Sequence, residues 1–86
     1  MGMYLSQMVS GQPAQVVGVE RASAQVGDAT LRRLMELGFL EGEPVRVLRR
    51  GPGGREPLAV QVGQTQFALR CVEAQCVRVQ PLSTLV

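Results

Sequence analysis

Cys71 and Cys76 are the only thiols of the chain, and it contains no histidine. A zinc site of the usual kind needs about four ligands, drawn mainly from these two residue types. The two cysteines are five residues apart, so on a helix their side chains would point about 140° away from each other. The sequence therefore predicts no metal site and no cofactor, and it favours two small buried thiols.

The lack of histidine also removes the base that activates serine or cysteine in the usual nucleophilic triads. Glu41 and Glu43 flank Gly42 in a predicted turn. We interpret them as solvated carboxylates rather than as an acid/base pair. The glycine-rich stretch 51–54 lacks the Lys-Ser/Thr ending of a phosphate-binding loop, and no helix is predicted after it. We therefore expect no catalytic residues and a protein that is not an enzyme.

Four arginines, Arg46, Arg49, Arg50 and Arg55, cluster around one predicted strand and the glycine-rich loop that follows it. Such a cluster is most often a solvated outer face. It can also bind an acidic protein surface or nucleic acid. The net charge is only +2, and no exposed aromatic residue is interleaved for base stacking. We therefore place nucleic acid last and take the four arginines as the candidate partner-binding residues.

A short amphipathic helix with a defined end is the element around which the chain is organised. Its apolar residues recur at i, i+3 and i+4 and are predicted to face the core: Leu31, Leu34 and Met35. Asp28 precedes them and is the expected N-cap. Gly38 can adopt the left-handed conformation that ends a helix, and Phe39 would then fold back onto Leu34. The helix is expected to end near Leu37 and to need packing against a sheet.

Alternation of apolar residues predicts a hairpin of residues 58–62 and 65–69, joined by Gly63-Gln64 in a type II′ turn. Pairing outward from that turn puts Val60 opposite Phe67. The same register puts Val62 opposite Thr65 and Leu58 opposite Leu69. The large apolar residues, including Val60, Phe67 and Leu69, then share one face, which a slip of one residue would destroy.

Further strands are predicted at residues 15–19, 45–50 and 76–79, a loop at 51–57, and a single helical turn within 70–75. Residues 4–8 are expected to form one helical turn or an arm that lies on the core, and the alternative is a frayed terminus. Together these elements predict a mainly β fold, a small, partly open antiparallel barrel of about five strands whose one short α-helix plugs an opening.

The 86 residues are expected to form one domain, 1–86, since the chain is too short for two. Its apolar runs are far shorter than the roughly 20 residues that cross a bilayer. No secretory leader is recognised at its start. We therefore expect a cytoplasmic protein with no direct membrane insertion.

The same residues resemble the FeoA family over about residues 15–79, the core of the predicted domain. The resemblance rests on the helix-glycine stretch 31–39, Gly42, residues 45–50, Pro52, Pro57-Leu58, 67–70, Glu73-Ala74 and 77–79. It implies an SH3-like barrel and a small accessory protein of bacterial ferrous iron uptake. It also implies contact with FeoB, a membrane permease with a GTPase-like cytosolic part, and possible recruitment by FeoB to the inner face of the membrane.

A second hypothesis comes from another class. On this hypothesis the chain is a free-standing SH3-like regulatory domain of the metal-dependent repressor type, or a barrel that binds nucleic acid weakly. Similar SH3-like domains form the C-terminal part of metal-dependent repressors of the DtxR type, and basic barrels elsewhere bind nucleic acid. No helix-turn-helix is recognised in the chain, which speaks against direct reading of DNA. Self-association through an edge strand of the barrel stays open at this point.

Overall fold

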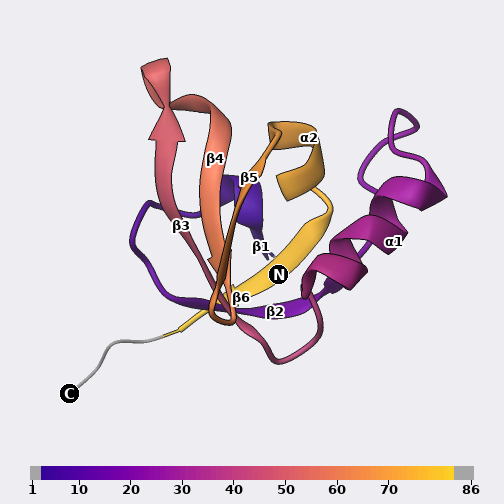
Figure 1. The fold of residues 1–86 in the computed structure, drawn as a ribbon, viewed down its shortest axis with the longest axis horizontal. Coiled ribbons are helices and arrows are strands. Elements are labelled where there is room, and N and C mark those ends of the chain that lie inside the picture. Colours follow the sequence, from indigo (N-terminus) through magenta and orange to yellow (C-terminus); the bar gives the residue numbers. More distant parts are fainter. Residues whose placement is uncertain (1–2, 83–86) are drawn as a thin grey trace.

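The computed structural model describes residues 3–82. In this part of the chain, six strands form one antiparallel sheet in the order β1-β6-β2-β3-β4-β5. The strands are β1 (Met3–Tyr4), β2 (Ala14–Val19), β3 (Pro44–Gly51), β4 (Arg55–Val62), β5 (Thr65–Leu69) and β6 (Val77–Pro81). The helices are α1 (Asp28–Leu37), α2 (Cys71–Ala74) and two short 3-10 helices, η1 (Leu5–Gln7) and η2 (Pro52–Gly54). Figure 1 shows β3, β4 and β5 side by side, with α1 beside the sheet.

The sheet bends sharply because extra residues interrupt its ladders. The pairing of β2 with β6 shifts register between Val16 and Gly18, and that of β3 with β4 shifts between Val47 and Arg49. Such bulges bend a strand and increase its local twist, so the sheet curls around a core. The mainly β, strongly bent antiparallel architecture is confirmed. The expected five strands become six because β1 is only two residues long and leaves no alternation in the sequence.

The predicted hairpin is confirmed residue by residue. Val62 pairs with Thr65, Val60 with Phe67, and Leu58 with Leu69. Gly63 has a φ of +58°, and no non-glycine residue in the described chain has a positive φ. A positive φ at the first central residue alone is what a type II′ turn requires. All three β4 residues in these pairs and Leu69 are buried, while Phe67 is half-buried against the core.

Helix α1 ends as expected but begins differently. Gly38 follows it with a φ of +114°, and its N–H donates to the Met35 carbonyl at 3.1 Å. The Phe39 N–H donates to the Leu34 carbonyl at 3.2 Å, which completes a Schellman motif. The prediction of Asp28 as N-cap is wrong, because Gly27 holds that position and Asp28 is the first helical residue. The Asp28 carboxylate pairs with Arg21 instead.

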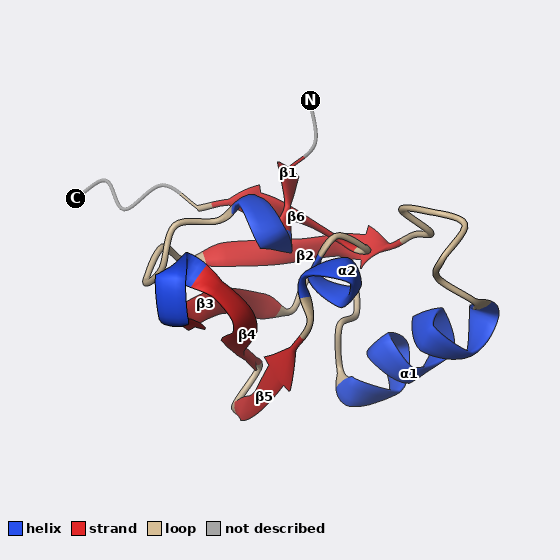
Figure 2. Cartoon of the chain, turned by 90° about the horizontal axis from the view of Figure 1, so that it is seen from above, coloured by secondary structure: helices blue, strands red, loops and turns tan. Residues whose placement is uncertain are grey.

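The core-facing stripe of α1 is displaced from the predicted one. Leu34 is fully buried and Leu31 is half-buried, but Met35 is 45% exposed, so its placement in the core was wrong. The half-buried Leu37 takes its place. The reason is geometric: α1 lies beside the sheet with α2 and β5 on one side of it (Figure 2), so only the stripe spaced by three residues around Leu34 reaches the core.

Two segments are more ordered than the sequence indicated, namely the N-terminal segment and the predicted loop that follows β3. Near the N-terminus, Leu5 and Met8 are buried, so the segment lies on the core as an arm and is not frayed. The loop predicted over residues 51–57 is shorter, because β4 already begins at Arg55. Gly51 pairs with Arg55 and Arg50 with Leu58, so the two intervening residues of β4 form an irregularity that accommodates a proline.

The remaining predicted elements agree with the structure to within two residues. The strand expected at 15–19 is β2, the one expected at 76–79 is β6, and the helical turn within 70–75 is α2. Arg33 on α1 and Glu73 on α2 form an ion pair at 3.0 Å that links the two helices. No helix in residues 3–82 has both the length and the apolar character needed to cross a membrane.

Replacing Gly38 by alanine should lower the free energy of unfolding by about 1–2 kcal/mol, because alanine must then hold a left-handed φ. A Cβ at position 38 would lie 3.8 Å from Val62 Cγ1, an ordinary contact, so the cost is conformational. Equilibrium urea unfolding measures it. Gly18→Ala is the matched control, since its φ is not positive and its Cβ would meet open space. Equal destabilisation by the two substitutions would contradict this account of the helix end.

Candidate functional site

Two of the four predicted partner-binding arginines share one face of the sheet. Arg46 lies opposite Gln61, which lies opposite Gln66, so their side chains form one row across β3, β4 and β5. A second row runs parallel to the first and consists of Arg49, Ala59 and Ala68. We call these six residues the outer face.

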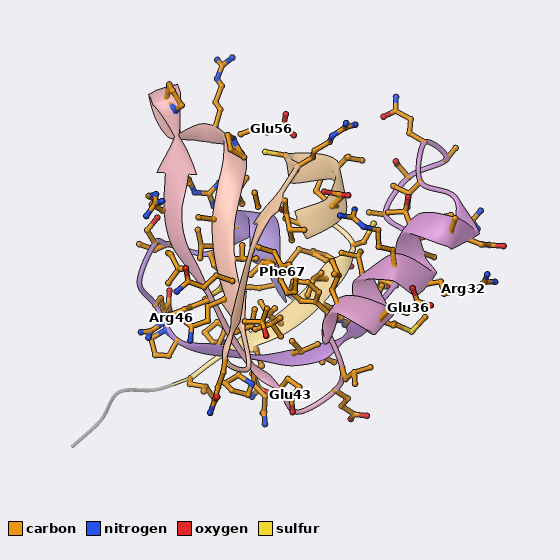
Figure 3. All side chains as sticks on the ribbon, in the orientation of Figure 1. Arg32, Glu36, Glu43, Arg46, Glu56 and Phe67 are labelled. Carbon is orange, nitrogen blue, oxygen red and sulfur yellow. The ribbon has the colours of Figure 1, made fainter. Side chains whose placement is uncertain are left out.

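The outer face is basic, and both of its arginines are accessible to a partner. It carries two guanidinium groups and no carboxylate, and both arginines are exposed. Within residues 3–82 the ion pairs use other arginines, namely Arg21, Arg33 and Arg78. A carboxylate from another molecule can therefore pair with Arg46 or Arg49 without breaking an internal ion pair. Figure 3 shows Arg46 on the side of the molecule away from Arg32 of α1.

A shallow hollow adjoins the Arg46 end of the outer face. It has a volume of about 140 Å³ and its lining is mostly apolar: Pro13, Ala14, Pro44, Val45, Arg46, Gln61, Gly63 and Leu82. Strand β3 supplies three of the lining residues and β2 supplies Ala14. The hollow extends the outer face with an apolar recess beside a charged group, an arrangement that suits a protein surface.

Arg50 and Arg55 do not belong to the outer face. The Arg50 guanidinium donates to the carbonyl oxygens of Ser6 at 2.8 Å and Met8 at 2.9 Å, so it holds the N-terminal arm against β3. Arg55 is exposed at the start of β4, next to η2. The structure thus divides the predicted cluster into two arginines that share a face, one that holds the N-terminal arm, and one at the connection between β3 and β4.

The two cysteines are free thiols in different surroundings. Cys76 is fully buried, and its Sγ lies 3.5 Å from the Val72 carbonyl oxygen, to which the thiol donates. Cys71 is half-buried, and its backbone N–H donates to Glu56 Oε1 at 2.5 Å. Among the residues that the structure describes, no group of three His, Cys, Asp or Glu side chains could hold a metal ion together.

Sequence reasoning missed the small and amide side chains of the outer face. Ala59 and Ala68 contribute only methyl groups beside Arg49, and Gln61 and Gln66 supply hydrogen-bonding groups beside Arg46. The signal that could have found them is the alternation of the hairpin, since the positions between its buried residues necessarily share the opposite face.

A family model described as FeoA domain matches residues 3–81, which include the whole sheet and both α-helices. The chain belongs to the FeoA family. Comparison of this FeoA protein with curated proteins gives no match. The outer face therefore lies within the residues that match the FeoA domain model rather than in an added segment.

Solved FeoA structures share the fold. FeoA of Stenotrophomonas maltophilia complexed with zinc, described as a procaryotic SH3 domain protein, is 50% identical over 91% of this chain and 89% of that chain, with a TM-score of 0.80. FeoA of Chlorobium tepidum is 32% identical over 98% of this chain and 74% of that one, also with a TM-score of 0.80. The expected SH3-like fold is thereby confirmed.

A manganese-dependent transcriptional repressor has the same fold in part of its chain. It is 22% identical to this FeoA protein, with a TM-score of 0.73 over 94% of this chain but only 42% of the repressor. At that identity the likeness shows the fold alone. It agrees with the repressor-type alternative as regards architecture and carries no argument about function.

Arg50→Met should lower the free energy of unfolding by about 2 kcal/mol, because it removes two charge-assisted hydrogen bonds to the N-terminal arm. Arg49→Met is the matched control, because Arg49 is the neighbouring exposed arginine on the same strand and its side chain makes no hydrogen bond within the described residues. Urea unfolding compares the two. Equal stability of both variants would show that Arg50 does not brace the arm.

Proposed function

We propose that this FeoA protein is an accessory protein of bacterial ferrous iron uptake that acts by binding the cytosolic part of a FeoB-type permease. The observation that carries the proposal is its 50% identity to the FeoA of S. maltophilia, whose description names it as a candidate activating factor of ferrous iron transport. Identity at that level over nearly the whole length of both chains favours a shared role.

The outer face supports contact with a protein as the way of acting. Arg46 and Arg49 are anchored on a rigid β-ladder, so little conformational entropy of the backbone is lost when a partner binds. Guanidinium groups pair with carboxylates through two parallel hydrogen bonds, which gives direction as well as affinity. Ala59 and Ala68 let an opposing surface approach closely. We therefore assign the partner-binding role to Arg46 and Arg49, with Arg55 at the margin.

The proposed contact also implies a location in the cell. A partner that exposes its GTPase-like part to the cytosol requires a cytoplasmic FeoA, held at the inner face of the membrane only while it is bound. In this role the protein turns over no substrate of its own, and it influences iron uptake through the transporter that it contacts.

Charge reversal at Arg46 and Arg49 should weaken binding to the isolated cytosolic part of FeoB at least about tenfold, because a close charge pair becomes a repulsion. Isothermal titration calorimetry with the full chain measures the affinity. The test compares Arg46→Glu/Arg49→Glu with Arg32→Glu, which reverses an exposed arginine on α1, away from Arg46 (Figure 3).

Three outcomes are distinguishable. Weakened binding of the double variant alone supports both the contact and the surface. Unchanged binding of the double variant means that the outer face is not the docking surface. Absence of any binding by the unmodified protein contradicts the proposed contact itself.

A further inference from the structure

Strand β5 ends the sheet and leaves one edge of its backbone unused. It pairs only with β4, through three pairs that the tight turn makes hydrogen-bonded: Val62 with Thr65, Val60 with Phe67, and Leu58 with Leu69. In an antiparallel ladder the residues between such pairs direct their N–H and C=O groups to the other side. Those residues are Gln66 and Ala68. Within residues 3–82 neither has a backbone hydrogen bond on that side.

This edge lacks the features by which proteins usually protect an edge strand. The five residues of β5 include no charged residue and no proline, and none of its pairings is bulged. The opposite edge of the sheet differs, because β1 is only two residues long. A regular, uncharged edge of this length is a template on which another strand can pair.

The surroundings of the β5 edge select the chemistry of an added strand. Arg70 follows β5, is exposed and has no ion pair among the described residues. On the core-facing side, Phe67 is half-buried, and the centroid of its ring lies 6.3 Å from the ring centroid of Phe39. Figure 3 places Phe67 toward the middle of the molecule, away from Arg46. An added strand would therefore meet a guanidinium on its outer side and an aromatic surface on its inner side.

We propose that the β5 edge binds an extended acidic segment of a partner protein by strand addition. The N–H and C=O groups of Gln66 and Ala68 supply the backbone hydrogen bonds. Because strand side chains alternate, carboxylates on one side of the segment lie toward Arg70 and the outer face, and apolar residues on the other side pack against Phe67. This inference rests on the proposed function only for the identity of the partner.

Charge favours such a segment over a second copy of this chain. Antiparallel pairing of β5 with its own copy about a two-fold axis would place both outer faces on the same side of one continuous sheet. The arginines of both copies would then share that side with no carboxylate on either outer face to compensate them. An acidic segment neutralises the same charges, most directly at Arg70.

The test uses a short peptide of alternating glutamate and valine, with a lysine-valine peptide of equal length as the control. Titrated into isotopically labelled full chain, the acidic peptide should shift the amide signals of Gln66 and Ala68 and slow their hydrogen exchange. The lysine peptide should leave them unchanged. No effect of the acidic peptide on these amides, or an equal effect of both peptides, overturns the proposal.

Backbone and charge variants separate the two parts of the recognition. Ala68→Pro removes an N–H that no residue of the described chain uses and should weaken binding of the acidic peptide at least about tenfold. Arg70→Gln should also weaken binding of the acidic peptide, because it removes the guanidinium that pairs with the carboxylates. If Ala68→Pro does not fold, the hydrogen exchange of the unmodified protein gives the same decision.

Two further outcomes are decisive. Dimerisation seen by sedimentation, with concentration-dependent shifts of Gln66 and Ala68 in the protein alone, assigns the edge to a second copy and overturns the proposal. The same amides, followed with the cytosolic part of FeoB, separate the two ideas. FeoB that binds without protecting them upholds the proposed function and rejects the β5 edge as its docking place. Binding of the acidic peptide without binding of FeoB upholds the β5 edge as a binding site and rejects the proposed function.

Discussion

The register of the β4–β5 hairpin is the constraint on which the rest of the molecule depends. With Val60 opposite Phe67, every large apolar residue of the hairpin faces the core, and Ala59, Gln61, Gln66 and Ala68 face outward. A slip of one residue would exchange the two faces completely. Gly63 fixes the register, because only a turn with its positive φ joins the strands without splaying them.

The core side of this hairpin also positions the helix. The Phe67 ring packs beside the ring of Phe39. Phe39 directly follows Gly38, where α1 ends, and is buried in the core. Leu34 is buried one turn earlier on the same helix. A helix of ten residues is marginal in water by itself, so these contacts hold it in place. The Arg50 guanidinium does a comparable task for the N-terminal arm, with hydrogen bonds in place of apolar contacts.

The solvent side of the same hairpin carries the two surfaces proposed for function. Side chains at alternate positions of β3, β4 and β5 form the outer face, and the backbone of β5 forms the free edge beside it. Both follow from one pairing pattern, since the residues whose side chains lie outward on β5 are also those whose N–H and C=O groups lack a neighbour. A partner strand would contact both surfaces at once. Its backbone hydrogen bonds to β5 would provide affinity, and the arginines would provide specificity for acidic side chains.

The sequence by itself determined the elements governed by local rules: the hairpin and its register, the end of α1 at Gly38, and the mainly β class, because alternation and glycine conformations are written in neighbouring residues. Only the tertiary structure decided which face of α1 touches the core, so Met35 was misplaced. It alone separated Arg50 from Arg46 and Arg49, because the partners of Arg50 lie more than forty residues away in the chain. Contacts at such separation leave no periodic signal, and the free edge of β5 depends likewise on which strands become neighbours.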